Sequence, residues 1–480
     1  MKTYQWISML IVLGMVLASC ASPTPERIVE TVIVEKQGET VVQTVEVPKT
    51  VIETVEVEKT VIQTVEVKKE IVEPKCDFAP PTEPVEITYI GWPGLMTDAY
   101  ASFLQKCASV KNIDTNVRIM DNASAQEQML LAFSSGSPSP YAIVHQANSS
   151  IQRNAWKDWL TPLTDLVEKY REKYNLDDIA PVHWEAATFD GKILGIPMAA
   201  NSIIIMYRSD LFEKHNLKVP TTYDEIITAC TALKEEPGIN VPFGLDLSAG
   251  WAWAIGFFEA LHSMGGDFFV EGENTPAFNS PQGVAALTKM KEVIDACMGP
   301  EGLAMGYQDL ALGLQNGSVG FIHIRASSGA AMNNPEKTEF YNEIKFAPAP
   351  AVEAGGKLAG SAWNDYWSIP ASFKGDVEAV FQVIMEAADV DNQMKAASLG
   401  LVTRTSVIES GVASPAALAA VDTISKGIGP YPKRPTLPLL TAALGNWLPF
   451  VGTGEMTPEE ALQKAEEEYI NGAKAQGYLK

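Results

Sequence analysis

Apolar runs of strand length alternate with stretches of helical periodicity along most of the chain. A strand pattern at 85–90 precedes a helix pattern, and further strand patterns at 117–120 and 141–144 enclose a helix pattern at 126–133. Strands that alternate with helices predict βαβ units and largely parallel sheets. The body of the chain is therefore expected to have an α/β fold.

The segment 189–226, FDGKILGIPMAANSIIIMYRSDLFEKHNLKVPTTYDEI, has the most detailed pattern. After a glycine-led turn it predicts a short apolar strand that ends at Pro197, then a crossing segment, then a second apolar strand over 203–207. Thr222 and Glu225, three residues apart, match the capping box that starts a helix. The segment therefore predicts two strands joined by a crossing, followed by helices.

A ten-residue repeat precedes this body. TVVQTVEVPK, TVIETVEVEK and TVIQTVEVKK occupy 40–69, after a weaker copy. Because ten is even, the valine-rich odd positions stay on one face of an extended strand, whereas a helix would rotate them away. The repeats are expected to be extended and to act as a spacer, and residues 21–75 would reach at most roughly 180 Å. Since exposed valine edges tend to pair, a self-associating β-stalk is the alternative.

The first 20 residues have the features of an export signal. Lys2 precedes an apolar run over 7–18, which is shorter than the roughly 20 residues that span a membrane. The run ends in LASC, which looks like a bacterial lipobox. We therefore expect residues 1–19 to be a signal peptide that is removed, and Cys20 to carry a lipid. An ordinary secretion signal with an incidental cysteine is the alternative.

The charge of the chain limits its partners. The formal net charge is −23, and it is −24 without residues 1–19, which contain one lysine and no acid. Nucleic-acid phosphates need a basic surface, so nucleic acid is not expected as a partner. At 480 residues, the chain exceeds one typical domain.

Lipidation of Cys20 would leave four cysteines in an oxidising compartment, where three pairings are possible. Cys230 and Cys297 each lie on the apolar face of a predicted helix, and Cys107 lies on that of the first helix, near Cys76 in sequence. The favoured pairs are 76–107 and 230–297, and four buried free thiols are the alternative. No Cys/His spacing indicates zinc, so no metal or other cofactor is expected.

The segment 189–226 resembles the family 1 extracellular solute-binding proteins of ABC importers, whose pattern runs roughly DGK-x-YGIP…N…YN-K-DLF…G…P-x-TWDE. FNSPQGVAALTKMKEVID, ALGLQNGSVGFIHI and the APAP…WSIP region resemble later parts of the pattern, so the likeness spans roughly 83–475. It implies a two-lobed, maltose-binding-protein-like fold (type II periplasmic binding protein). Each lobe would be a mostly parallel sheet flanked by helices, and hinge crossings would join the lobes.

The leader, the repeats and this resemblance together imply a division of the chain into four parts. They are a lipoprotein signal peptide (1–19), a lipid-anchored repeat stalk and linker (20–82), one lobe (83–200 plus 358–395) and a second lobe (201–357 plus 396–475).

In such a fold, ligands lie where strands end at the lobe interface. A sugar site needs flat aromatic surfaces for apolar ring faces, and polar groups for the hydroxyls. Packing roles for the tryptophans, and turn-forming roles for the asparagines at 148 and 201, are the alternatives. The expected ligand-binding residues follow strands or lie on the crossings: Trp92, Gln146, Asn148, Asn201, Asp246, Trp251, Arg325, Trp363, Asn364 and Asp365.

The resemblance implies a solute-binding protein, not an enzyme, on the extracellular face of the cell membrane (periplasmic if there is an outer membrane). It would close two lobes around a carbohydrate, an oligosaccharide or glycoside, and deliver it to an ABC permease. Arg325 stands where many relatives carry an aromatic, and it supports a glycerophosphodiester or another anionic solute as the alternative.

Two further functions are less favoured. A surface glycoside hydrolase needs a carboxylate pair, and none is singled out, so no catalytic residue is expected. The GxSxG, HExxH and P-loop patterns are also absent. A structural or adhesive role would rest on the repeats alone.

Overall fold

The computed structural model describes residues 28–36, 39–47, 76–248, 250–427 and 431–480. The chain divides into two compact units, residues 1–74 and 75–480. The expected signal peptide, the lipidation site at Cys20 and the repeats beyond residue 47 lie outside the described residues. Among the residues described, no helix has both the length and the hydrophobicity needed to cross a bilayer.

In the first unit, two strands form an antiparallel hairpin. β1 (Ile28–Lys36) pairs with β2 (Glu39–Val47) along its whole length. β1 lies in the weaker copy of the repeat, and β2 covers most of the first full copy. The extended conformation predicted for the repeats is confirmed in β2. The weaker copy and the first full copy pair with each other within one chain. The spacer role stays a prediction.

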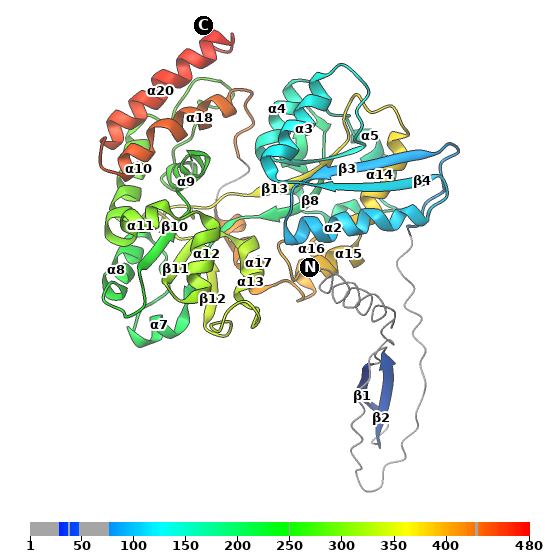
Figure 1. Cartoon of the computed structure of the whole chain (residues 1–480), viewed down its shortest axis with the longest axis horizontal. Helices are drawn as coiled ribbons and strands as arrows, with labels where there is room; N and C mark the ends of the chain where they lie inside the picture. The colour runs from blue at the N-terminus through cyan, green and yellow to red at the C-terminus, as the bar shows by residue number, and fades with distance from the viewer. Residues whose placement is uncertain (1–27, 37–38, 48–75, 249, 428–430) are drawn as a thin grey trace, which may run out of the picture. The chain divides into compact units, whose positions relative to one another are not determined.

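The second unit contains two main sheets, and the first has the strand order β4-β3-β5-β13-β8 (Figure 1). β3 is parallel to β4 and β5, while β13 is antiparallel to both of its neighbours. The strands are β3 (Val85–Gly91), β4 (Ile113–Ile119), β5 (Ile143–Ala147), β8 (Ile196–Asn201) and β13 (Trp363–Ser368).

The second sheet has the order β10-β11-β9-β12. β10 and β11 are parallel, and β9 is antiparallel to both β11 and β12, so one strand in each main sheet runs against the others. The predicted α/β fold with mostly parallel strand directions is thus confirmed. The strands are β9 (Ile203–Arg208), β10 (Val241–Leu245), β11 (Val319–Arg325) and β12 (Ile344–Pro348), and a separate hairpin joins β6 (Thr188–Phe189) to β7 (Lys192–Ile193).

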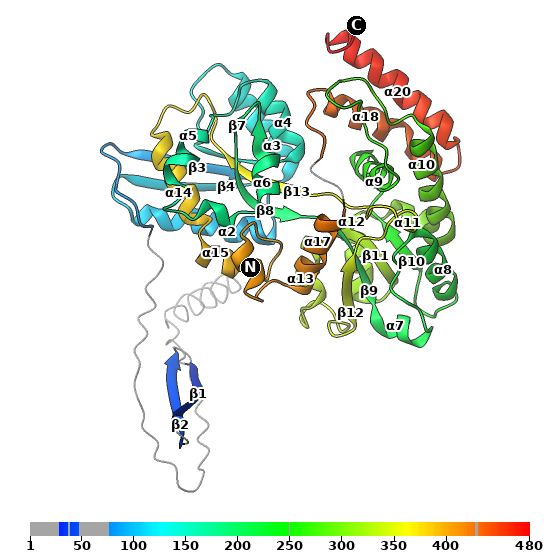
Figure 2. The same cartoon turned by 180° about the vertical axis from the view of Figure 1, so that it is seen from behind.

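The chain passes from the first sheet to the second with almost no loop (Figure 2). β8 ends at Asn201 and β9 begins at Ile203, so only the buried Ser202 separates strands of different sheets. The sequence predicted that the first strand ends at Pro197, and this was wrong, since β8 continues through it. β8 is an edge strand, and its pairing with β13 shifts register next to Pro197, so the proline stands where strands tolerate it, at an edge and beside an irregularity.

A second difference concerns β4, which begins four residues before the predicted strand at 117. β4 is the other edge strand of the first sheet, and its buried and exposed residues alternate. Its exposed polar residues, Asp114 among them, hid the start of the strand from a search for an apolar run.

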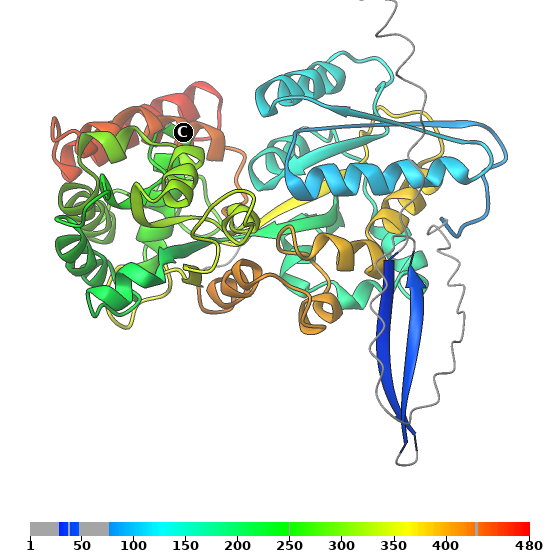
Figure 3. The same cartoon turned by 60° about the horizontal axis from the view of Figure 1, so that its bottom comes forward.

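Helices cover both faces of the first sheet (Figure 3). One face packs against α2 and α14, and the other against α3. Val402 and Val407 share the core of this lobe, beyond the boundary expected at 395. The helices are α2 (Leu95–Lys106), η1 (Cys107–Ser109), α3 (Asn122–Ser134), α4 (Asn148–Trp156), α5 (Thr164–Tyr170), η2 (Leu176–Asp178), α6 (Pro181–Ala187), α14 (Val377–Ala387), α15 (Val390–Ala396) and α16 (Thr405–Glu409).

The second sheet is also covered on both faces. One core joins its side chains to α8, α9, α10, α18 and α20, and another joins them to α12 and α17. The helices are α7 (Ser209–Lys214), α8 (Tyr223–Leu233), α9 (Gly250–Ser263), α10 (Pro281–Val293), η3 (Ile294–Met298), α11 (Gly299–Ala304), α12 (Tyr307–Asn316), η4 (Ala326–Ser328), α13 (Gly329–Met332), α17 (Pro415–Lys426), α18 (Leu437–Trp447), α19 (Pro449–Gly452) and α20 (Pro458–Ala475).

The predicted helix start at Thr222 is confirmed with one change. Thr222 Oγ1 accepts a hydrogen bond from the backbone N–H of Glu225. The Glu225 carboxylate, however, accepts from the backbone N–H and the hydroxyl of Thr221, at 2.7 Å each, instead of from Thr222. The cap therefore extends one residue further back than the usual box.

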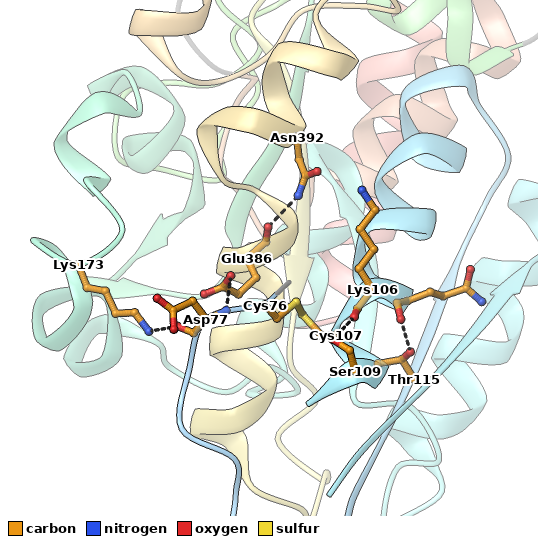
Figure 4. The surroundings of a disulfide bond; sticks show 10 residues. Cys76, Asp77, Lys106, Cys107, Ser109, Thr115, Lys173, Glu386 and Asn392 are labelled. Atoms are coloured by element: carbon orange, nitrogen blue, oxygen red, sulfur yellow. Dashed lines mark hydrogen bonds between the residues drawn. A yellow bond between two sulfur atoms is a disulfide. The ribbon is translucent and has the colours of Figure 1, made fainter. Parts of the chain in front are cut away.

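Both favoured disulfides are confirmed. Cys76 bonds to Cys107, where α2 ends, with 5.2 Å between the Cα atoms, and Cys230 bonds to Cys297, with 5.3 Å. Near the first bond, the backbone N–H of Asp77 donates to the Glu386 carboxylate at 3.0 Å (Figure 4). The start of the second unit is thus fixed to the first lobe by a covalent bond and a hydrogen bond.

Candidate functional site

A cluster centred on a guanidinium lies at the carboxyl end of the second sheet. Arg325 ends β11, and Asp246 follows the parallel neighbour β10, so both side chains meet at the same sheet edge. Arg325 Nη1 lies 3.5 Å from Asp246 Oδ2. The guanidinium also stacks over the rings of Trp251 and Tyr307, 4.8 Å from each centroid. Two cation–π contacts and an ion pair hold Arg325 in one orientation.

The exposure of these side chains shows what a ligand can touch. Trp251 is 47% exposed, which is unusual for a tryptophan, whereas the Arg325 side chain is 28% exposed. Burial raises the pKa of the Asp246 carboxyl, and the nearby Arg325 charge opposes that rise. The cluster therefore offers an open aromatic surface beside a cation that already has a carboxylate partner.

A small cavity of about 40 Å³ lies next to this cluster. Its lining includes Glu259 of α9, His323 of β11 and, toward solvent, Trp251 and Arg325. Burial raises the pKa of the Glu259 carboxyl to about 8, although Ser361 donates a hydrogen bond to it at 2.6 Å. Burial lowers the pKa of His323 to about 3. Both side chains are therefore predominantly uncharged at neutral pH.

In the first lobe, Trp92 follows β3 and is partly exposed. Its ring stacks on the His145 imidazole, with 3.6 Å between centroids and 16° between planes. The His145 Nδ1 atom lies 3.2 Å from the Tyr89 hydroxyl, and Nε2 lies 3.1 Å from Asp365 Oδ1, within ion-pair distance but outside hydrogen-bond geometry. His145 thus holds the Trp92 ring in place as an aromatic surface, and Asp365 lies beside His145.

Two predicted residues lie at the crossing between the sheets. Asn201 Nδ2 donates to the Ser327 hydroxyl at 2.9 Å, and its Oδ1 accepts from the backbone N–H groups of Ser202 and Ser327. Trp363, which pairs with Asn201 across the sheet, packs on Tyr431 with 4.9 Å between ring centroids. Both are partly exposed, and both also stabilise the crossing.

Three predicted residues are buried and bonded inside the protein. Gln146 accepts a hydrogen bond from Asn154, and Asn364 Oδ1 bonds to His183. Asn148 donates to the Ala362 carbonyl and accepts from the backbone N–H of Asn364. Asn148 therefore satisfies backbone groups, which is the role that the sequence suggested as the alternative to ligand binding. None of the three residues lines the cavity beside Arg325.

A segment near residue 433 links the two lobes. Tyr431 and Leu437 belong to the core of the second lobe. Between them, the Lys433 ammonium donates to the Thr188 carbonyl at 3.1 Å and also to that of Glu185, and the Arg434 backbone N–H donates to Gln152 at 3.0 Å. The acceptors lie in or next to α4 and α6 of the first lobe, so this segment bridges the lobes.

The sequence search missed Tyr307, His145, Glu259 and Lys433. Glu259 had a signal, since it is the sole carboxylate in the apolar stretch GWAWAIGFFEALHS of α9. An apolar helix is expected to be buried on most sides, and an acid is almost never fully buried unless it is paired. The other three had no comparable signal, because their partners come from distant parts of the chain.

Comparisons with known proteins bear on these observations. A family model described as bacterial extracellular solute-binding protein matches residues 85–380. A mannitol-binding protein of Pseudomonas aeruginosa is 23% identical over 349 residues, which cover 68% of this chain and 78% of that protein. An ABC transporter solute-binding protein of Agrobacterium radiobacter K84, solved with ribitol, has a TM-score of 0.71 at 22% identity, over 82% of this chain and 99% of that one.

A further relative, an uncharacterised ABC transporter extracellular-binding protein of Pyrococcus horikoshii, is 40% identical over 78 residues, which cover 16% of this chain. The match spans 19% of that relative's length. The family model covers well over half of the chain and includes both main sheets. The chain therefore belongs to the bacterial extracellular solute-binding protein family.

Proposed function

We propose that the protein binds a neutral carbohydrate between its two lobes. The observation that carries the proposal is an exposed or partly exposed tryptophan near a strand end in each lobe: Trp92 directly after β3, and Trp251 at the start of α9, the helix that follows β10. Each has a polar neighbour, Asp365 or Arg325, that can bond hydroxyl groups. Flat aromatic surfaces with polar groups at their edges match the apolar face and hydroxyl rim of a sugar.

The relatives support the same class of ligand. One is named for mannitol, and one was solved with ribitol, and both compounds are neutral polyols. Beyond binding, we propose lipid anchoring through Cys20, the repeats as a stalk, and delivery of the solute to an ABC permease at the outer face of the cell membrane. These steps rest on the leader sequence, the repeats and the family.

An anionic solute such as a glycerophosphodiester is the second candidate, because Arg325 is a partly exposed cation. Its charge is already matched by Asp246 at 3.5 Å. A bound anion would therefore compete with that carboxylate, which favours the neutral ligand.

Thermal-shift screening separates these candidates. The purified protein is heated with maltose, D-mannitol, ribitol and D-glucose, and separately with glycerophosphocholine and glycerol 3-phosphate. A ligand at a hundred times its Kd stabilises the folded state by about 2.7 kcal/mol. We expect stabilisation by at least one neutral compound. A shift with the phosphate esters alone would reverse the assignment.

A further inference from the structure

The cavity beside Arg325 has room for a small group only. A water molecule needs roughly 10–15 Å³ measured in the same way, so the cavity of about 40 Å³ accommodates about three such groups. This matches a carbon atom and its hydroxyl, but not a whole sugar ring. A ligand stacked on Trp251 would place one of its arms, not its ring, in this space.

One buried polar atom among the described residues that line the cavity lacks a partner. His323 is 4% exposed, and its Nε2 atom has no hydrogen-bond partner among the described residues. Glu259 is 3% exposed and bonds to Ser361 through one carboxyl oxygen. A buried polar atom without a partner destabilises the protein, so the site favours a group that can bond to it.

The chemistry of that group follows from these two side chains. A protonated carboxyl group donates one hydrogen bond, and a neutral imidazole donates through one nitrogen and accepts through the other. A hydroxyl group both donates and accepts, so it suits either tautomer of His323. An anion would lie beside the Asp246 carboxylate, and the nearby Arg325 already pairs with that carboxylate.

We propose that this cavity binds the terminal hydroxymethyl group of a neutral sugar or sugar alcohol. The proposal rests on the proposed function and deepens it. The ring or chain of the ligand lies against Trp251, while its primary alcohol enters between Glu259 and His323. The protein thereby selects ligands that have a free primary alcohol at one end.

The first test compares ligands. Isothermal titration calorimetry is carried out with D-glucose, D-mannitol and ribitol, and with 6-deoxy-D-glucose, 1,6-dideoxy-D-mannitol and 1,5-dideoxyribitol, which have no primary alcohol. We expect each deoxy analogue of a bound compound to bind at least tenfold more weakly. Equal binding of a compound and its deoxy analogue would overturn this inference and leave the proposed function intact. If no neutral carbohydrate binds, the proposed function fails and this inference fails with it.

The second test fills the cavity without harming the fold. Gly256 lines the cavity, and a methyl group there would meet Met290 Cε at 3.5 Å and Leu247 Cδ2 at 3.6 Å, both ordinary contacts. Alanine also favours a helix more than glycine does, so Gly256→Ala is expected to fold at least as stably as the native protein. We expect it to bind the alcohol at least tenfold more weakly.

Gly472→Ala is the matched control. Gly472 lies in α20, remote in the fold from the cavity lining, and an added methyl group would lie 3.7 Å from the nearest atom, on Leu439. This variant should bind as the native protein does. Unchanged binding by Gly256→Ala would show that the cavity is not used.

Discussion

Single residues carry most of the chemistry proposed for this protein, and Glu259 is the clearest case. It lies in the core of the second lobe, beside a cavity, with one hydrogen bond to Ser361. The other ionisable groups in the cavity wall are Tyr223, Asp246, His323 and Arg325. The pKa values of Glu259 and His323 shift in opposite directions on folding, so the two groups give opposite dependences of stability on pH.

The pH dependence of unfolding tests the burial of Glu259. Its pKa rises from 4.5 to about 8 on folding, so this contribution to stability is present below pH 4.5 and is lost as pH rises toward 8. The pKa of His323 falls from 6.5 to about 3, so its contribution is lost as pH falls from 6.5 toward 3. Between pH 6.5 and 8 most of the His323 contribution is already present, so the loss at Glu259, up to about 1.4 kcal/mol per pH unit, is the larger of the two effects.

Glu259→Gln should remove that dependence. Denaturant unfolding at pH 6.5 and pH 8 should show a loss of stability in the native protein and a much smaller loss in the variant. Parallel losses in both proteins would mean that Glu259 is not the group responsible.

Trp251 and Trp253 form a matched pair for testing surface against core. Trp251 is 47% exposed, while Trp253 is 2% exposed and belongs to the core of the second lobe. Trp251→Ala should weaken carbohydrate binding at least tenfold and change the free energy of unfolding by less than about 1 kcal/mol. Trp253→Ala should destabilise the protein by about 3–5 kcal/mol. A large stability loss from Trp251→Ala would identify it as a packing residue.

At the residue scale, the sequence could predict which residues are candidates for ligand binding, but not which side chains contact them. Trp92, Asp246 and Trp251 were predicted because they lie in segments that follow strands, and Arg325 because it ends an apolar strand where many relatives carry an aromatic residue. Gln146 was predicted as a polar residue after the third apolar run, yet it is buried, because α4 follows β5 at once and covers it. Only the fold determines which side of a strand end faces the solvent.

At the scale of elements, the crossing from β8 to β9 has the largest consequence. A continuous extended segment belongs to both sheets, so a change in the angle between the lobes must be taken up near Ser202. The sequence predicted both strands and the order of elements well, because they are strongly apolar. It misplaced strand ends at the sheet edges, at Pro197 and at Ile113, where the apolar pattern is weakest.

The two disulfides offer an element-scale prediction. The Cys230–Cys297 bond closes a sequence separation of 67 residues and ties α8 to the turn after α10, and the Cys76–Cys107 bond closes 31 residues. Replacing either pair by alanine should lower the free energy of unfolding by about 2–4 kcal/mol, with the larger effect at 230 and 297, since longer closed loops restrict the unfolded chain more. Chemical denaturation measures both values. No stability loss at either pair would contradict the structural role of these bonds.

At the scale of the whole molecule, the second unit has two lobes joined by the β8–β9 crossing, by the chain between β12 and β13, and by the segment around Lys433. The sequence resemblance implied the two lobes, and the sheets, the cores and the family match agree. The bridge at Lys433 could not be predicted, because its acceptors are the backbone carbonyls of Glu185 in α6 and of Thr188 just after it, and backbone carbonyls leave no mark on the sequence.

Closure of the two lobes around a carbohydrate is the central claim, and small-angle X-ray scattering tests it most directly. Residues 75–480 form a compact unit with cores of their own and are measured alone and with a saturating neutral carbohydrate. We predict a smaller radius of gyration with the carbohydrate and no change with glycerol 3-phosphate. A radius that stays constant while calorimetry shows binding, or turnover of an added glycoside, would contradict a receptor that closes on its solute.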